Sequence, residues 1–371
     1  MPAVLGRRAL NRALLARQHL LAPAELTPEQ LLTHLVGLQS QATDPPYYGL
    51  WCRLPDFAPE QLGGLLETRA AVRLGLQRGT IHLVTAADGL RLRPLLQPVL
   101  DQGLRGGYGK LLAGLDLAAM TERGRRLVDE APRTFQELGA LLGADHPERD
   151  PAALAQALRA RLALVQVPPR GLWRTGGAAA HTTAEHWLGR PLDTPADPAE
   201  QELRLDELVL RYLAAFGPAT VADAQKWSGL TRLGAVFTRL RPRLTELRDE
   251  AGRTLHDLPD APRPGPAAPA PVRLLAPFDN LLLSHADRTR VLPEEYRTRV
   301  MTQNGIVPGT LLVDGFVAGT WRVERSGDRA AAELTVFAPL AASARRAAEE
   351  EAERLLAFAA PEATAREVTL R

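Results

Sequence analysis

The sequence predicts a mainly α-helical protein with additional β-structure, an α+β fold, in which three similar units precede a small β-rich domain. Two observations predict it. Patterns for helices followed by a β-hairpin recur three times before residue 259, and strand patterns dominate the chain after a proline-rich linker. Helices that lead into a short hairpin give the outline of a winged helix. We therefore expect three tandem winged-helix domains followed by a β-rich C-terminal domain.

Length and composition limit the possible classes of protein. With 371 residues and 45% apolar content, the chain can bury substantial cores and is expected to form two to four domains. The single cysteine, Cys52, excludes an internal disulfide and favours a reducing compartment. There is no apolar signal-peptide core and no apolar run long enough to span a bilayer. We expect a cytoplasmic, nucleoid-associated protein.

The first unit is expected over residues 1–110. Leucine spacing predicts a helix over 6–20, which carries arginines but no acid and would present a basic face to phosphates; these are Arg7, Arg8, Arg12 and Arg17. The segment Thr27-Pro28-Glu29-Gln30 has the form of a capping box and starts a helix over 28–39. The prolines of Asp44-Pro45-Pro46 are expected to end any helix. A helix over 57–67 and a hairpin of 71–76 with 80–84 complete the unit.

The remaining units follow in the same order. The second, 111–200, has helices over 117–129, from 134 and over 151–161, then a wing of 162–167 with 171–174. The third, 201–259, has helices near 206–216, 220–228 and 231–241, then a hairpin of 244–248 with 254–258. The proline- and alanine-rich segment 260–271 is a stiff linker. The β-rich domain, 272–371, has strands at 272–275, 311–313, 316–318, 321–324, 334–337 and 367–370, with a helix over 342–359.

Two glutamines, Gln39 and Gln41, flank Ser40 at the predicted end of a helix. A carboxamide can hold a water molecule but cannot deprotonate it. A Gln-x-Gln pair is common by chance, and amides that cap a helix end are the simpler interpretation. The neighbouring motifs make the pair more significant.

Those motifs together resemble the bacterial winged-helix DNA glycosylases of the AlkZ type, from about residue 6 to about residue 325. They are Gly37-Leu38-Gln39-Ser40-Gln41 through Tyr48-Gly49-Leu50-Trp51, the segment Arg78 to Val84, the segment Leu275 to Asp279 with Asp287-Arg288, and Thr310 to Gly315 with Gly319-Thr320-Trp321. The resemblance implies that Gln39 and Gln41 are the catalytic pair of an enzyme that excises alkylated purines and unhooks interstrand crosslinks. A related branch has aspartate at the second position. Ser40 departs from the hydrophobic residue expected between the glutamines.

The implied chemistry does not need a strong base. A purine alkylated at N7 or N3 is already cationic, so it leaves readily and the sugar becomes oxocarbenium-like; the enzyme must place a water molecule and stabilise developing charge. The only lysines, Lys110 and Lys226, are distant in sequence from the glutamines. We therefore expect a monofunctional glycosylase without lyase activity and without a cofactor.

Other residues are candidates for contacts with DNA, and each has a structural alternative. Arg78 and His82 lie on the first hairpin, where His82 is either a DNA-facing group or a locally bonded strand residue. Asp279 and His285 are expected near the lesion with Arg288 on a phosphate, or else Asp287 and Arg288 are structural partners. Arg174, in Trp173-Arg174-Thr175-Gly176-Gly177, holds a phosphate or belongs to a turn beside a buried tryptophan. His181, Glu185 and His186 lack further ligands, so a solvated helix end is favoured over a metal site.

Three functions follow from these patterns. The first is a monomeric repair glycosylase whose concave, positively charged surface holds double-stranded DNA with alkylated bases. The second is a tandem winged-helix transcription regulator without catalysis. The third helices, 152–161 and 232–240, offer few base-reading side chains and make a regulator less favoured. The third is a family member that handles another lesion or none.

Overall fold

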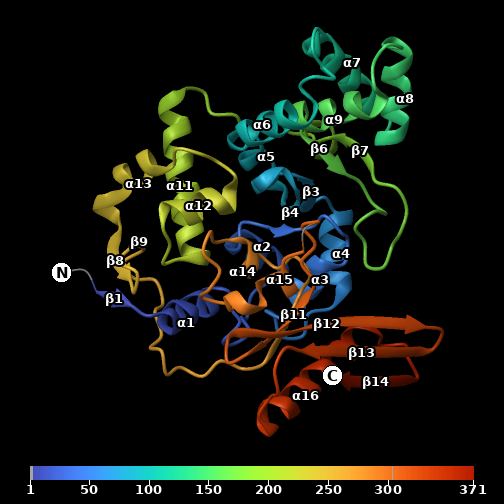
Figure 1. Cartoon of the computed structure of the whole chain (residues 1–371). Coiled ribbons are helices and arrows are strands. Elements are labelled where there is room, and N and C mark those ends of the chain that lie inside the picture. Colours follow the sequence, from blue (N-terminus) through green and yellow to red (C-terminus); the bar gives the residue numbers. More distant parts are fainter. Residues whose placement is uncertain (1–2, 303) are drawn as a thin grey trace.

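The computed structural model describes residues 3–302 and 304–371, and these residues form a mixed helix and strand fold (Figure 1). The described strands form three sheets, with strand orders β1-β8-β9, β2-β4-β3-β6-β7-β5 and β10-β11-β12-β13-β14. The predicted α+β class is confirmed. The division into three winged helices, with the boundaries given above, stays a prediction. In the described part of the chain, no helix combines the length and apolarity that crossing a bilayer requires.

The first unit has more helices than predicted, and its hairpin is where the pattern places it. Thr27 and Gln30 form the expected capping box at the start of α2. The 3₁₀ turn η1 (Gln77–Gly79) connects the strands of the hairpin. The elements are α1 (Arg7–Arg17), α2 (Pro28–His34), β2 (Leu38–Gln39), α3 (Pro45–Trp51), α4 (Pro59–Glu67), β3 (Ala71–Gly75), β4 (Ile81–Thr85), α5 (Ala86–Leu95) and α6 (Gln97–Tyr108).

Gln39 ends the short strand β2 and Gln41 lies just beyond it, which corrects the prediction that a helix continues to residue 39. Helix α2 ends at His34, and the chain then turns through Val36 (φ 55°) and Gly37 (φ 90°). A methyl group on Gly37 would lie 2.4 Å from a side-chain carbon of Val84, so only glycine allows this approach. The prolines at 45 and 46 begin α3 instead of ending a helix, because the first turn does not need their missing N–H groups.

The second unit keeps its predicted helices, but its wing has a different partner. Strand β6 (Leu164–Gln166) pairs with β7 (Ala180–Thr183), and not with residues 171–174, which lie in the loop between them. The single pair Leu74↔Val165 joins this unit to the first hairpin and makes one continuous sheet. The other elements are α7 (Leu117–Glu130), β5 (Arg133–Thr134), α8 (Phe135–Asp145), α9 (Pro151–Arg161) and α10 (Ala184–Leu188).

The third unit and the C-terminal domain largely follow the sequence pattern. Helix α11 starts at Pro198, capped by Asp197, earlier than predicted, and the expected strands at 316–318 and 321–324 are one continuous strand, β12. The elements are α11 (Pro198–Phe216), α12 (Val221–Ser228), α13 (Gly234–Leu240), β8 (Thr245–Asp249), β9 (Thr254–Asp257), β10 (Arg273–Leu275), α14 (Asn280–Leu283), α15 (Arg297–Val300), β11 (Gly309–Val313), β12 (Phe316–Ser326), β13 (Arg329–Val336), α16 (Ala342–Ala359) and β14 (Ala365–Leu370). Strand β1 (Val4–Leu5) adds to β8 in parallel.

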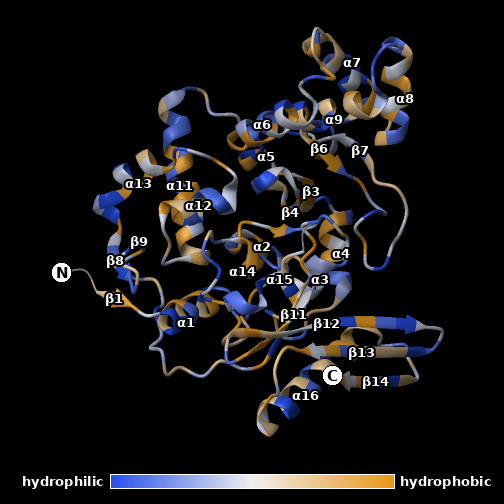
Figure 2. Ribbon diagram, viewed as in Figure 1, coloured by the Kyte–Doolittle hydropathy of each residue, from blue (hydrophilic) through white to orange (hydrophobic). Residues whose placement is uncertain are grey.

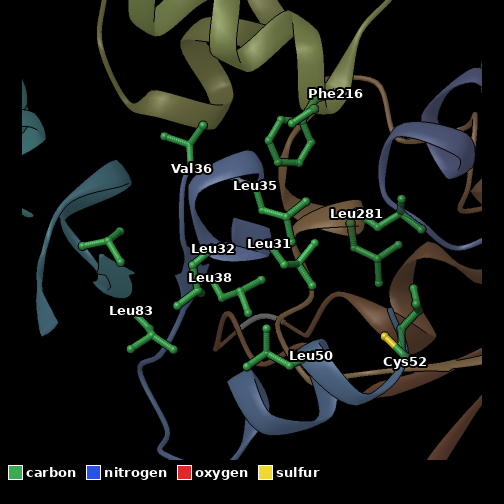
Figure 3. Packing of buried hydrophobic residues seen from close by; sticks show 14 of the residues in the cluster. Leu31, Leu32, Leu35, Val36, Leu38, Leu50, Cys52, Leu83, Phe216 and Leu281 are labelled. Atoms are coloured by element: carbon green, nitrogen blue, oxygen red, sulfur yellow. The ribbon is translucent and has the colours of Figure 1, made fainter. Parts of the chain in front are cut away.

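The main hydrophobic core joins the units. Phe216 of α11 and Leu281 of α14 pack with the buried residues of α2, β2, α3 and β4 (Figure 3). A second core lies within α6–α9 and β6, around Leu138, Leu154 and Leu158. Hydrophilic residues gather at the far end of the β12–β13 hairpin (Figure 2). Strand β2, which carries Gln39, is therefore fixed by packing from several parts of the chain.

Candidate active site

Three of the predicted site residues meet at one end of the first hairpin. Gln39 on β2 is paired in register with His82 on β4. Arg78 lies in the turn η1, directly before β4. The Nη2 group of Arg78 donates to Oε1 of Gln39 over 2.9 Å and lies 3.3 Å from Nε2 of His82. Arg78 is half-buried and Gln39 is 9% exposed. The hairpin thus places a carboxamide, a guanidinium and an imidazole in direct contact.

The second glutamine lies on the same edge and is exposed. The backbone N–H of Ile81 donates to Oε1 of Gln41 over 3.2 Å. Side chains two residues apart on an extended segment point to the same side, so Gln39 and Gln41 share a face. Both oxygens face donors, which fixes the orientation of each amide. Neither amide nitrogen is hydrogen-bonded within the described residues, so each can donate to a water molecule or a ligand.

Ser40 points to the opposite side and is fully buried. The guanidinium of Arg73, on β3, donates from Nε to the Ser40 hydroxyl oxygen over 2.9 Å and from Nη2 to its carbonyl oxygen over 2.8 Å. A hydrophobic side chain at position 40 would leave the buried Nε of Arg73 without its acceptor. The departure from the expected hydrophobic residue therefore has a local structural reason.

The charges at this site are unusual because no carboxylate takes part. Burial, and then the charge of Arg78, lower the pKa of His82 to about 3, so the imidazole is neutral at pH 7. Nδ1 of His82 lies 3.1 Å from the Thr80 carbonyl, so Nδ1 carries the proton and Nε2 accepts from Arg78. Burial lowers the pKa of Arg78 to about 10, which leaves it cationic. The site can hold water and donate hydrogen bonds, but it contains no free general base among the described residues.

Helix α12 of the third unit holds Arg78 in place. Nη1 of Arg78 donates to the carbonyl oxygen of Trp227 over 2.5 Å. Gly229, which caps α12 with φ 82°, packs directly on the turn: a methyl group there would lie 3.1 Å from the backbone nitrogen of Arg78. The position of Arg78 therefore depends on the packing of a distant segment.

Asp279 and His285 are not at this site, which corrects the expectation that they reach a lesion. Asp279 is 3% exposed, and both of its carboxylate oxygens accept from Arg53 over 2.8 Å. His285 is 1% exposed, and its Nε2 lies 3.1 Å from the carbonyl oxygen of Phe216. Both side chains stabilise the interior and cannot contact a ligand without unfolding around them.

Asp287 and Arg288 are not partners of each other, so that structural alternative is also wrong. Asp287 pairs with Arg253 over 2.6 Å. Arg288 donates from Nε to the Leu282 carbonyl over 2.7 Å and has no carboxylate partner among the described residues. Arg288 is half-buried and stays a candidate for a phosphate contact.

The N-terminal helix does not present the basic face that its sequence predicts. Arg12 pairs with Asp314 and Arg17 with Asp257, and both guanidiniums are buried. Arg8 also pairs with Asp314, but it is exposed. The exposed Arg7 lies over the ring of Phe316, 5.5 Å from its centre. Only Arg7 and Arg8 remain available to a ligand.

Arg174 lies in the loop before β7 and is neutralised by Glu362, with 2.6 Å between Nη1 and Oε1. The adjacent Trp173 packs against Tyr47 and Tyr48, with ring centres 4.8 and 5.5 Å apart. These contacts agree with the alternative of a turn beside a packed tryptophan. The contact of Arg174 with a phosphate stays a prediction.

The residues considered as metal ligands have other contacts. His181 lies on β7, not at a helix end, and stacks on Phe135 with 4.1 Å between ring centres. Glu185 pairs with Arg125 over 3.1 Å. Within residues 3–302 and 304–371, no group of acidic, histidine or cysteine side chains is arranged to hold a metal ion.

Sequence reasoning missed Arg73 and Trp227. An arginine inside the apolar run of β3 is a signal that could have identified Arg73, because a buried charge in such a strand needs a polar partner. Trp227 acts through its backbone carbonyl, and no side-chain pattern reveals such a role.

Comparisons with known proteins agree on one group. The sequence model of a family described as "DNA glycosylase AlkZ-like" matches residues 32–358. A curated relative from Streptomyces sahachiroi, the interstrand DNA cross-link repair glycosylase, is 24% identical over 326 residues, which cover 83% of this chain and 85% of the relative. The solved structure of the DNA glycosylase AlkZ from the same organism superimposes with a TM-score of 0.79 at 21% identity and covers 100% of both chains.

Proposed function

The chain belongs to the AlkZ-like DNA glycosylase family, and we propose that it hydrolyses the N-glycosidic bond of purines alkylated at N7 or N3, using a water molecule that Gln39 and Gln41 position. The observation that carries this proposal is the placement of two carboxamides on one edge, each with its oxygen held by a donor and its nitrogen not hydrogen-bonded to any described residue. The match to the glycosylase family favours this function over that of a transcription regulator.

The absence of a base at this edge suits a cationic substrate. Cleavage of an alkylated purine needs little activation of the leaving group, because the base departs neutral from a bond that its positive charge has already weakened. A water molecule that donates a proton to the second lone pair of an amide oxygen, and accepts from no more than one amide nitrogen, keeps a lone pair directed to C1′ as positive charge develops on the sugar. After this oxygen bonds to C1′, the extra proton passes to solvent, and the alkylated base leaves neutral. Arg78 fixes the Gln39 amide and needs no contact with the base.

Unhooking of interstrand crosslinks is the second part of the proposal, and it is supported by the activity for which the Streptomyces relative is named. Gln41 is exposed just beyond the end of β2, whereas Gln39 is 9% exposed. The exposed Gln41 can reach a base that stays near the duplex, as a crosslinked base must. Three winged-helix units around duplex DNA, in a monomer, would provide the surrounding surface.

The test uses a duplex with a single N7-methylguanine, followed by hot alkali to cleave abasic sites. We expect excision by the native protein, and a loss of at least about 100-fold for Gln39→Ala or Gln41→Ala, because a misplaced water removes most of the benefit of orientation. Gln136→Ala, at an exposed glutamine of α8, is the matched control and should keep full activity. Unchanged excision in both alanine variants would refute the assignment.

The same reaction tests for lyase activity. We expect no strand cleavage without alkali and no covalent adduct after borohydride, because in the described residues neither Lys110 nor Lys226 is hydrogen-bonded to Gln39 or Gln41. A trapped adduct on the purified protein would contradict the monofunctional mechanism.

A further inference from the structure

The buried and half-buried arginines fall into two groups. Most are neutralised by a carboxylate, as Arg12, Arg17 and Arg53 are. A second group has no carboxylate within ion-pair distance among the described residues: Arg73, Arg78, Arg93, Arg159, Arg170 and Arg288. A charge withdrawn from water without a counter-ion is costly, so residues of this second group are candidates for binding an external anion.

Two members of the second group meet at the tip of the first hairpin. Arg159, on α9, donates from Nη2 to the carbonyl oxygen of Gly79 over 3.3 Å, and Gly79 directly follows Arg78. Burial lowers the pKa of both guanidiniums. The two cations therefore share one small region, and within the described part of the chain no carboxylate lies at ion-pair distance from either of them.

A pocket of about 320 Å³ opens at this point, between α6, α9 and the turn η1. Its polar lining is Arg78, Arg159, Tyr108 and Gln156, and its apolar wall comes from α6. Gly103 of α6 also lines the pocket, and the space where its Cβ would lie is open. The residues that line the pocket include two arginines, a tyrosine and a glutamine, and each of these side chains carries a hydrogen-bond donor of the kind that a phosphate group requires.

We propose that this pocket binds a backbone phosphate of the DNA duplex through Arg78 and Arg159, with Tyr108 and Gln156 as additional donors. The inference rests on the proposed function, because it takes double-stranded DNA as the substrate. A guanidinium group can bind two phosphate oxygens at once, and the phosphate supplies the negative counter-charge that the pocket lacks.

The site also has a consequence for the reaction. Arg78 lines the phosphate pocket and holds Oε1 of Gln39 at 2.9 Å. A phosphate on one side of this guanidinium and the catalytic amide on the other fix the distance between the DNA backbone and the glutamine pair. The pocket would thus set which nucleotide lies opposite Gln39.

The experiment measures binding of an undamaged duplex by fluorescence anisotropy over a range of salt concentrations. Each phosphate neutralised by a protein cation contributes about 0.9 to the slope of log K against log salt. We expect Arg159→Gln to lower that slope by about 0.9, while Arg159→Lys, which keeps the charge, retains it. Arg161→Gln is the control on the same helix, since Arg161 already pairs with Asp101 and should leave the slope unchanged.

A second pair of variants tests the pocket without removing any contact of the protein. Gly103→Asp places a carboxylate at the pocket, where it competes with the phosphate and lowers the slope. Gly107→Asp adds the same charge one turn later on α6, in equally open space and outside the pocket, and should bind as the native protein does. The same slope for Gly103→Asp, Gly107→Asp and Arg159→Gln as for the native protein would overturn the proposal.

Excision of N7-methylguanine by the native protein separates the two proposals. If the native protein does not excise but Arg159→Gln lowers the slope, the phosphate site stands and the glycosylase assignment fails. If the native protein excises and neither Arg159→Gln nor Gly103→Asp alters the slope, the assignment stands and the phosphate site fails.

Discussion

At the scale of single residues, the ion pair of Arg53 and Asp279 separates a structural role from a role in DNA binding. Both groups are buried, and two hydrogen bonds of 2.8 Å join them. Removal of one partner leaves an uncompensated buried charge. We expect Asp279→Asn to lower the free energy of unfolding by about 3–5 kcal/mol in urea denaturation.

The double variant Arg53→Met with Asp279→Leu is the matched comparison, and it should be destabilised less than either single variant because no charge is stranded. DNA affinity of the folded fraction should not change. An Asp279→Asn protein with native stability but weakened DNA binding would instead restore the lesion-facing interpretation.

The residues of the candidate site were only partly predictable from sequence. Gln39, Gln41, Arg78 and His82 were selected by motif, and the structure brings Gln39, Arg78 and His82 into contact. Asp279 and His285 belong to equally distinctive motifs but are buried. The partner of Asp279 is 226 residues away in sequence, at Arg53, and no local pattern indicates a contact over that separation.

At the scale of elements, the contact between α12 and the turn η1 supports a prediction about Gly229. This residue has φ 82°, and a methyl group there would lie 2.9 Å from a Val99 methyl group and 3.1 Å from the backbone of Arg78. Gly229→Ala should displace Arg78 from Gln39. We expect a reduced excision rate at saturating DNA, with a lower free energy of unfolding.

Gly189→Ala is the control for the backbone alone. Gly189 caps α10 with φ 64°, and no atom lies within 4 Å of its Cβ position. The left-handed conformation costs an alanine about 1–2 kcal/mol at either position, so both variants should lose this stability. If the excision rate falls equally in the Gly229→Ala and Gly189→Ala variants, the contact between Gly229 and Arg78 has no specific role in excision.

Helices were predictable because their signals are local. The capping box of Thr27 and Gln30, and Asp150 before α9, fix the starts of helices through contacts between near neighbours. The pairing of strands is not local. Strand β6 pairs with β7 and not with residues 171–174, which are nearer in sequence, and this pairing depends on the path of the loop. The end of α2 was missed because the turn at Gly37 is set by its contact with Val84.

At the scale of the whole molecule, buried neutral histidines predict how stability depends on pH. Burial lowers the pKa of His82 to about 3 and of His181 to about 4, whereas an unfolded histidine titrates near 6.5. Below pH 6.5 the unfolded chain binds protons that the folded chain does not bind. The free energy of unfolding should therefore fall as pH drops from 6.5 toward 4, by about 1.4 kcal/mol per pH unit for each histidine.

Urea denaturation at pH 7 and pH 5 measures this dependence. His181→Phe keeps an aromatic ring against Phe135 and removes one titrating group, so the stability of this variant should fall less steeply between the two pH values. Equal losses for the variant and the native protein would exclude His181 as a source of the pH dependence.

The attachments of the first helix have a consequence for synthesis on the ribosome. Arg8 and Arg12 form ion pairs with Asp314, which lies 306 and 302 positions later in the sequence. Arg17 forms an ion pair with Asp257. Until those acids emerge from the exit tunnel, the arginines of the nascent helix lack the carboxylates with which they pair in the folded protein. Helix α1 can therefore reach its final place only after residues that are synthesised much later than the helix itself.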